Sequence, residues 1–172
     1  MKQKTETQLC ISFMELLRKY PFPKITIATI ASECGVNRQT FYYHFDNVYD
    51  LMGRAFEYEL MNNESLSEGS SREEIMRHFL CWMRDNKVII KNILTNVEAG
   101  YLRKAIYPLV FRVMGREEDH DGNEKEEGVG FTEHFLVIGI TQYILEWAES
   151  DFKENVDDII RELFSLIKKI YA

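Results

Sequence analysis

Residues 26–45, TIATIASECGVNRQTFYYHF, predict two short helices that meet at a glycine. In the first helix, Ala31 is small at a position where a second helix has to approach closely. Gly35 follows the last helical turn, and because glycine adopts the left-handed conformation at little cost, the chain can turn sharply there. Asn37 predicts the start of the second helix, since its side-chain oxygen can accept a hydrogen bond from a backbone N–H of the first turn.

The second helix, Arg38 to Phe45, has two dissimilar faces when its residues are placed at intervals of about 100°. Phe41 and Phe45 fall together and face inward, whereas Gln39 and Tyr43 lie opposite them. Arginine and glutamine can form paired hydrogen bonds with purine edges, while tyrosine and threonine can contact phosphates or thymine methyl groups. No acidic residue lies in this helix. The pattern predicts DNA contacts by Thr26, Asn37, Arg38, Gln39, Thr40, Tyr42, Tyr43, His44 and Asn47.

A second interpretation is an ordinary helical hairpin whose exposed aromatic residues meet a protein partner. The combined spacing of alanine, glycine and phenylalanine favours a helix-turn-helix instead. The stretch ITIATIASECGVNRQTFYYHFDNVYDL, residues 25–51, resembles the DNA-binding segment of the TetR family of bacterial transcription regulators. The match is close over residues 9–60, and beyond residue 60 the resemblance is only architectural. PFPKITI and NRQTFYYHF are similar to the branch that contains regulators of dihydroxyacetone kinase operons.

The resemblance implies a homodimer that binds a palindromic operator on double-stranded DNA and is regulated by a small apolar effector. The dihydroxyacetone kinase branch instead implies a protein coactivator. One position departs from the family pattern, because Val48 stands where the family has a phosphate-binding lysine.

The net charge of −7 is unevenly distributed along the chain. Residues 1–45 contain six basic and three acidic residues, a formal charge of +3, whereas the remainder contains 15 basic and 25 acidic residues, a charge of −10. A basic end on an acidic body directs one end of the molecule towards DNA.

Helical periodicity continues through the chain and predicts an all-α fold. A first helix from about residue 4 to 20 completes a three-helix N-terminal unit, and a fourth helix, capped by Asp46 or Asn47, links this unit to a C-terminal helical bundle that dimerises. We therefore predict a helix-turn-helix DNA-binding domain over residues 1–46 and a regulatory and dimerisation domain over residues 47–172. The bundle helices are predicted near residues 72–85, 87–96, 97–114, 130–149 and 153–171.

Aromatic residues are dense in the bundle and have two interpretations. They can be ordinary core residues, or some of them can line an apolar effector pocket. The second interpretation predicts a pocket formed by Trp82, Tyr101, Tyr107, Phe111 and Trp147.

The last two predicted helices are too apolar to be buried on one side only. A helix that is apolar around its whole circumference has to be covered twice, so we predict that both helices pair with their copies in a four-helix interface. The interface residues predicted in this way are Phe135, Ile140, Tyr143, Trp147, Leu163, Phe164, Ile167 and Tyr171.

Other functional classes find little support in the sequence. The acidic run from Arg116 to Gly128 contains His120, but its spacing does not fit a calcium loop, and the three cysteines lie too far apart for a metal cluster. No Gly-rich phosphate loop, HExxH or nucleophile elbow is present, so we expect no enzyme, no cofactor and no metal. Without a membrane span or an export signal, we expect a cytoplasmic protein. A helical adaptor that binds only protein remains the alternative to a DNA-binding regulator.

Overall fold

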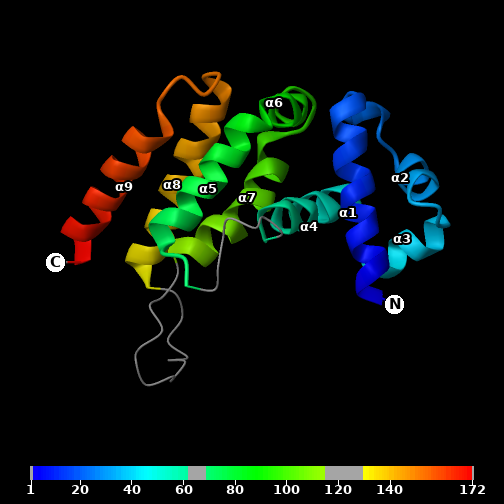
Figure 1. Ribbon diagram of the computed structural model, residues 1–172, viewed down its shortest axis with the longest axis horizontal. Coiled ribbons are helices and arrows are strands. Elements are labelled where there is room, and N and C mark those ends of the chain that lie inside the picture. The colour runs from blue at the N-terminus through cyan, green and yellow to red at the C-terminus, as the bar shows by residue number, and fades with distance from the viewer. Residues whose placement is uncertain (1, 62–68, 115–129, 172) are drawn as a thin grey trace.

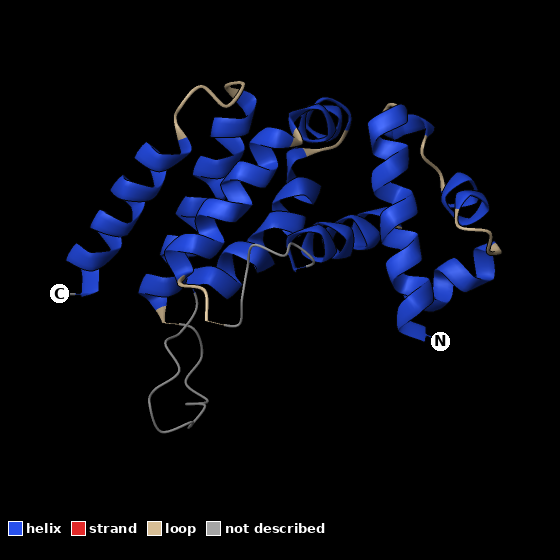
Figure 2. Ribbon diagram, in the orientation of Figure 1, coloured by secondary structure: helices blue, strands red, loops and turns tan. Residues whose placement is uncertain are grey.

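The computed structural model describes residues 2–61, 69–114 and 130–171, and every regular element in these ranges is a helix (Figure 2). The predicted all-α fold is therefore confirmed. In chain order the elements are α1 (Lys2–Lys19), the 3-10 turn η1 (Phe22–Lys24), α2 (Ile27–Glu33), α3 (Arg38–His44), α4 (Val48–Met61), α5 (Arg72–Asp85), α6 (Lys87–Asn96), α7 (Ala99–Met114), α8 (Phe131–Glu149) and α9 (Val156–Tyr171).

The helices form an elongated molecule in which α2 and α3 lie at one end and α9 at the other (Figure 1). We call α1 to α3 the N-terminal unit and α5 to α9 the body. Helix α4 joins them, because it packs against α1 and also against α7. One continuous cluster of buried hydrophobic side chains extends from Leu9 in α1 to Ile160 in α9. The boundary predicted after residue 46 thus falls at the start of a helix that both parts share.

The helices of the body have nearly the predicted bounds, and α5 and α6 have them without change. The last helix was predicted from residue 153 and begins at Val156. Asp151 and Phe152 adopt the left-handed conformation, with φ of 67° and 57°, which interrupts helical geometry. The side-chain oxygen of Asn155 then accepts a hydrogen bond from the Asp157 N–H at 2.8 Å, so the helix starts after this cap.

The turn between α2 and α3 has the predicted conformation. Gly35 has a φ of 71°, and the N–H of Val36 donates to the carbonyl oxygen of Ala31 over 2.9 Å, which closes the end of α2. Among the described atoms, none lies within 4 Å of the place where a Cβ on Gly35 would be. The requirement for glycine here is therefore conformational and not steric.

Two glycine substitutions should change the free energy of unfolding in opposite directions. Gly35→Ala is expected to lower it by about 1–2 kcal/mol, because alanine is strained in the left-handed conformation. Gly53 lies inside α4, where a Cβ would meet the Cα of Ala105 at an ordinary contact distance of 3.8 Å. Gly53→Ala is therefore expected to raise the free energy of unfolding by about 0.5–1 kcal/mol. Chemical denaturation measures both, and effects of the same sign would contradict this account.

Candidate nucleic-acid interface

The burial of two phenylalanines orients helix α3. Phe41 and Phe45 are buried, with ring centroids 5.8 Å apart. Ile30 and Ala31 of α2 are buried as well, and α2 packs against both α1 and α3. The predicted inward face of α3 is confirmed. Because this face is fixed in the core, the opposite face of α3 is directed to solvent.

Three of the polar residues predicted as DNA contacts form the caps that begin α2, α3 and α4. Thr26 and Thr29 form a reciprocal capping box at the start of α2. The Asn37 Oδ1 atom accepts hydrogen bonds from the Thr40 N–H at 2.8 Å and from the Thr40 hydroxyl at 3.0 Å, which confirms the predicted cap of α3. Asn47 likewise accepts from two backbone N–H groups at the start of α4. These caps fix where each helix begins.

The solvent-directed face of α3 carries hydrogen-bonding and aromatic side chains. Arg38 and Gln39 are exposed, and Tyr42 and Tyr43 have exposed fractions of 58% and 66%. Thr40 and His44 are half-buried at the flanks. The imidazole of His44 packs edge-on against the Tyr43 ring, with ring centroids 5.1 Å apart. The structure therefore places side chains that can donate and accept hydrogen bonds together on one face of a rigid helix.

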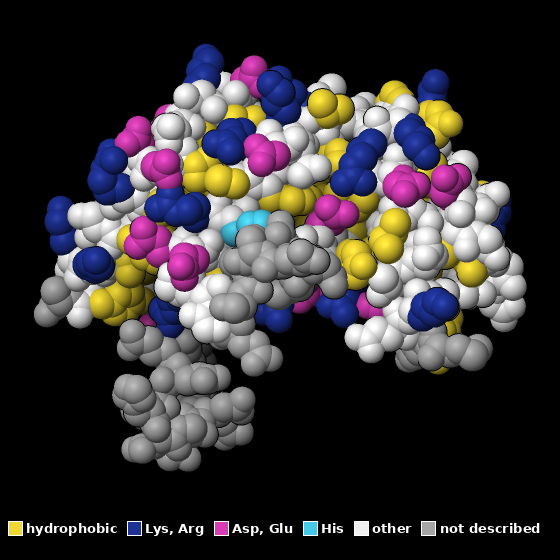
Figure 3. Space-filling view, in the orientation of Figure 1, with side chains coloured by type: hydrophobic (Ala, Val, Ile, Leu, Met, Phe, Trp, Pro, Cys, Tyr) yellow, Lys and Arg dark blue, Asp and Glu magenta, His cyan; other side chains and the backbone are white. Residues whose placement is uncertain are grey.

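The positive charge of the N-terminal unit is partly neutralised by ion pairs. The Lys19 ammonium lies 3.8 Å from the carboxylates of both Glu15 and Glu33, and the Arg18 guanidinium lies 3.6 Å from Glu59. Within the described part of the chain, Arg38 takes part in no ion pair. Figure 3 shows basic and acidic side chains interspersed over the face in view. The α3 face thus owes its chemistry to hydrogen-bonding groups more than to a basic field.

The residue that departs from the family pattern has a packing role. Val48 is the first residue of α4, is half-buried, and packs against the core cluster. A charged side chain in its place would have to leave this contact to reach a phosphate.

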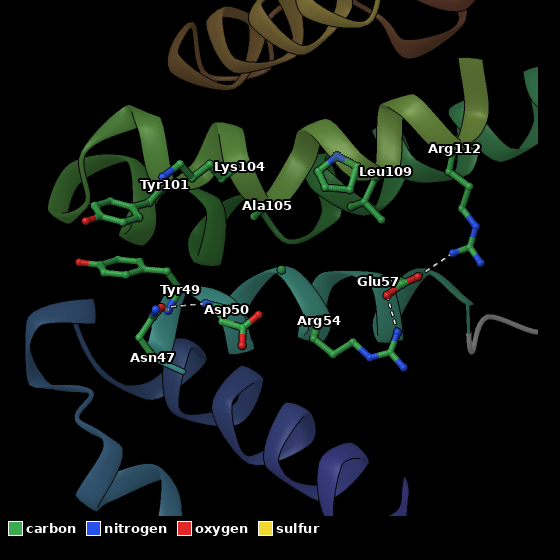
Figure 4. Close-up of a pocket in the computed structure, with 12 residues that line it drawn as sticks. Asn47, Tyr49, Asp50, Arg54, Glu57, Tyr101, Lys104, Ala105, Leu109 and Arg112 are labelled. Carbon is green, nitrogen blue, oxygen red and sulfur yellow. Dashed lines mark hydrogen bonds and ion pairs between the residues drawn. The ribbon is translucent and has the colours of Figure 1, made fainter. Parts of the chain in front are cut away.

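A cleft of about 480 Å³ lies between α4 and α7 (Figure 4). At one end the rings of Tyr49 and Tyr101 stack with centroids 3.7 Å apart. At the other end Glu57 accepts hydrogen bonds from Arg54 and, at 2.7 Å, from Arg112. The cleft could not be predicted from the sequence, because its charged residues come from helices that are distant in the sequence.

The five aromatic residues predicted to line one effector pocket lie in different surroundings. Tyr101 lines the cleft between α4 and α7, and the other four are not among its lining residues. Trp82 packs edge-on against Phe56, and Tyr107 stacks with Phe111. Trp147 is buried against Phe152 and donates its indole N–H to the carbonyl oxygen of Glu154 at 3.0 Å. The two tryptophans therefore serve as core residues, as the alternative interpretation has it.

The residues predicted for the dimer interface divide into two groups. Ile140 and Trp147 have exposed fractions of only 8% and 1%, so they pack within the protomer. These two residues therefore do not belong to the predicted interface. The helical angle of α8 directs these two positions inward. The other six are exposed or half-buried on α8 and α9, namely Phe135, Tyr143, Leu163, Phe164, Ile167 and Tyr171. Further exposed apolar residues on these helices are Phe131, Ile138, Leu166 and Ile170.

Three titratable groups have pKa values above their ordinary range. Burial and the neighbouring Glu154 carboxylate raise the pKa of Tyr143 to about 12, and its hydroxyl donates to that carboxylate at 2.6 Å. Burial also raises the pKa of the Cys10 thiol to about 12 and that of Cys34 in the same direction. These thiols are protonated near neutral pH and behave as small apolar groups.

Two further expectations from the sequence concern a metal site and a membrane span. The acidic run from Arg116 to Gly128, considered for a metal, lies outside the described residues. Among the helices that the structure describes, none combines the length and the apolar character needed to cross a membrane.

Sequence profiles identify the family. A profile described as "Bacterial regulatory proteins, tetR family" matches residues 14–55, and one described as "Transcriptional regulator C-terminal region" matches residues 70–169. The chain therefore belongs to the TetR family of transcription regulators, which confirms the resemblance found in the sequence. The match also supports a DNA-binding regulator rather than an enzyme. A comparison with curated proteins found no match.

Solved structures of similar fold cover almost the whole chain. The dihydroxyacetone kinase operon activator DhaS is 15% identical, with a TM-score of 0.58 and coverage of 96% of this chain and 94% of that one. A TetR transcriptional regulator from Streptococcus agalactiae is 19% identical, with a TM-score of 0.56 and the same coverage. Thermus thermophilus FadR, solved with lauroyl-CoA, is 16% identical, with a TM-score of 0.52 and coverage of 94% and 92%. At these identities the likeness shows the fold alone.

Replacing the cap of α3 should destabilise the protein in a way that depends on the oxygen acceptor. Asn37→Ala is expected to lower the free energy of unfolding by about 0.5–2 kcal/mol, because the Thr40 N–H and hydroxyl both lose their hydrogen bonds to the side-chain oxygen. Asn37→Asp should stay close to the wild type, since aspartate caps equally well and its charge suits a helix N-terminus. Chemical denaturation compares the two, and an equal loss in both would show that the cap does not hold α3.

Proposed function

We propose that this protein is a sequence-specific transcription regulator that binds an inverted-repeat operator in the cytoplasm as a homodimer, with α3 as its recognition helix. The observation that carries the proposal is the exposed face of α3, where arginine, glutamine and tyrosine side chains lie together without an acidic neighbour on the helix. Membership of the TetR family supports the same conclusion.

The positions of the side chains assign them different roles on DNA. Arg38, Gln39 and Tyr43 lie on the exposed face and would reach base edges in the major groove. Tyr42 and His44 would contact phosphates, together with Thr26 at the start of α2. Three predicted contacts remain, namely Asn37, Thr40 and Asn47. They cap helices or lie against the caps, so they would position the helices on the DNA backbone.

The alternative is a helical adaptor that uses the exposed aromatic residues of α3 to bind protein. Phosphate contacts make DNA binding strongly dependent on salt, whereas an adaptor would not be retained on duplex DNA at any salt concentration. Salt-sensitive retention of the protein on a duplex DNA column therefore distinguishes the two functions.

Base-reading and backbone-binding residues should differ in what their loss does to specificity. After an operator has been selected from random DNA, Gln39→Ala or Arg38→Ala is expected to cost about 1–3 kcal/mol on it and to relax the preference at one base pair in each half-site. Tyr42→Phe should weaken binding to operator and random DNA about equally, because a phosphate contact carries no sequence information. Titrations on both DNAs measure this. If Gln39→Ala also lowered both affinities equally, α3 would not read bases as proposed.

The dimer is proposed from the apolar surface of α8 and α9. Phe131, Phe135 and Ile138 are exposed on α8, and Leu166 and Ile170 are exposed on α9. Large contiguous apolar surfaces on a soluble chain mark sites of association. Both helices lie at the opposite end of the molecule from α3 (Figure 1), so pairing them with their copies leaves two recognition helices free for two half-sites.

Charged substitutions on this surface should dissociate the dimer. Phe135→Glu combined with Leu166→Glu is expected to give a monomer at micromolar concentration in sedimentation-velocity ultracentrifugation, because four charges would be buried in one interface. Val88→Glu is the matched control, since Val88 is also an exposed apolar residue but lies on α6. A monomeric wild type would contradict the proposed interface, and so would a dimer that persists in the double variant.

Control by a small molecule or a partner protein is proposed to act through the cleft between α4 and α7. Arg54, Lys104 and Arg112 line it together with the acids Asp50 and Glu57, and within the described part of the chain Lys104 forms no ion pair. A small organic anion would therefore suit the cleft. The structure of FadR with lauroyl-CoA supports an effector for a regulator of this fold. A ligand between α4 and α7 would contact both the body and the helix that leads to α3.

The anion preference of the cleft can be tested with phenyl phosphate, which combines a charged group with an aromatic ring. It is expected to raise the midpoint of thermal unfolding of the wild type and of Arg103→Ala, but not of Lys104→Ala. Arg103 is a suitable control because it neighbours Lys104 in sequence but donates to Gln142 on α8 at 2.6 Å. An unchanged wild-type midpoint, together with a partner recovered by pulldown, would favour the protein coactivator.

A further inference from the structure

Asn92 of α6 joins the body to the end of α1 through three hydrogen bonds. Its Oδ1 atom accepts from the Phe22 N–H at 2.8 Å. Its Nδ2 group donates to the carbonyl oxygens of Leu17, at 3.1 Å, and of Tyr20, at 2.8 Å. One side chain therefore meets the end of α1 and the first residue of η1, which lie 70 to 75 residues earlier in the chain.

The sequence around Pro21 explains why α1 needs an external donor. In a continuing helix the carbonyl oxygen of Leu17 would accept from the N–H of residue 21, and proline has none. The preceding carbonyl, that of Leu16, still finds its partner in the Tyr20 N–H at 2.8 Å. The amide of Asn92 supplies the missing donor for Leu17. A residue of α6 thus completes the hydrogen bonding at the end of α1.

The same contact lies between the proposed dimer surface and the recognition helix. Helix α6 packs against α8, which carries part of the exposed apolar surface, and also against α1 and η1. The chain continues from η1 directly into α2 and α3. A hydrogen-bonding clamp at this point constrains the orientation of the N-terminal unit with respect to the body, in addition to the packing of α4. In a dimer, that orientation determines the distance between the two copies of α3.

We propose that Asn92 is a positioning residue that sets which spacing between operator half-sites the dimer accepts; this rests on the proposed function. Asn92 lies on α6, outside the residues proposed to contact DNA, and its amide is engaged with the end of α1 and with η1. Its loss should therefore leave the base preferences within each half-site unchanged and widen the range of spacings that bind. A side chain that only stabilised the fold would instead lower the affinity for all spacings by the same factor.

The experiment uses the full chain and the operator selected for the wild type, with one or two base pairs inserted or removed between the half-sites. We expect the wild type to lose at least tenfold in affinity per base pair of change. Asn92→Ala should lose threefold or less, with unchanged preferences within the half-sites. The matched control is Lys91→Ala, because Lys91 precedes Asn92 on α6 but its ammonium pairs with the Asp151 carboxylate at 2.5 Å and not with α1. Its spacing curve should follow the wild type.

Two further variants separate positioning from stability. Asn92→Asp keeps the size and the acceptor but places an oxygen against two carbonyl oxygens, so it should widen the spacing range as alanine does. Adding Pro21→Ala to Asn92→Ala gives Leu17 a backbone donor without restoring the link to α6. This double variant should recover thermal stability while its spacing curve stays flat. If Asn92→Ala alone does not fold, the double variant takes its place in the spacing experiment.

The possible failures are distinguishable. A wild type that binds no selected DNA would overturn the proposed function and the role in spacing with it. Operator binding with the same spacing curve in the wild type, Asn92→Ala and the double variant would overturn the role of Asn92 alone. In the absence of DNA, exchange of the Phe22 amide hydrogen should be at least tenfold faster in Asn92→Ala, and equal exchange rates would show that the clamp is not formed.

Discussion

Helix α4 is shared by the N-terminal unit and the body, and its packing is the constraint on which the rest of the structure depends. Where α4 meets α7, Gly53 faces Ala105, and α4 also packs along α1 on its other side. An aromatic stack extends the contact from Phe22 of η1 through Tyr49 of α4 to Tyr101 of α7. A displacement of α7 therefore reaches the N-terminal unit through direct contacts, without a flexible linker between them.

Magnitudes show which interactions hold α4 in place. Glu6 of α1, Arg54 and Glu57 of α4, and Arg112 of α7 form a chain of ion pairs, but these side chains are a quarter to a half exposed. Exposed pairs of this kind contribute about 0.2–1 kcal/mol each. Full burial of one large apolar side chain such as Phe56 contributes about 1.5–3 kcal/mol. Apolar packing therefore determines the position of α4, and the polar contacts refine its orientation.

Local features of the fold could be predicted from the sequence, and long-range ones could not. The left-handed turn at Gly35, the cap by Asn37 and the inward face with Phe41 each depend on residues a few positions apart, and the structure confirms them. The predicted aromatic pocket depended on which helices are neighbours, and periodicity alone does not specify that. The contact of Asn92 with Phe22 is of the same kind, since nothing near residue 92 indicates an incomplete helix end at residue 17.

The distribution of charge suggests how such a regulator would separate specific from general DNA binding. Lys19 and Arg18 are engaged with carboxylates, Val48 at the start of α4 is apolar and packs against the core, and the body is acidic. Few cations are then left for phosphates, and it is phosphate contacts that dominate binding to random DNA. Affinity for an operator would depend mainly on paired hydrogen bonds from Arg38 and Gln39, which are lost on a wrong base. With weak backbone binding, the correct separation of the two recognition helices contributes a large share of the total affinity, because one misplaced helix leaves only a single half-site bound.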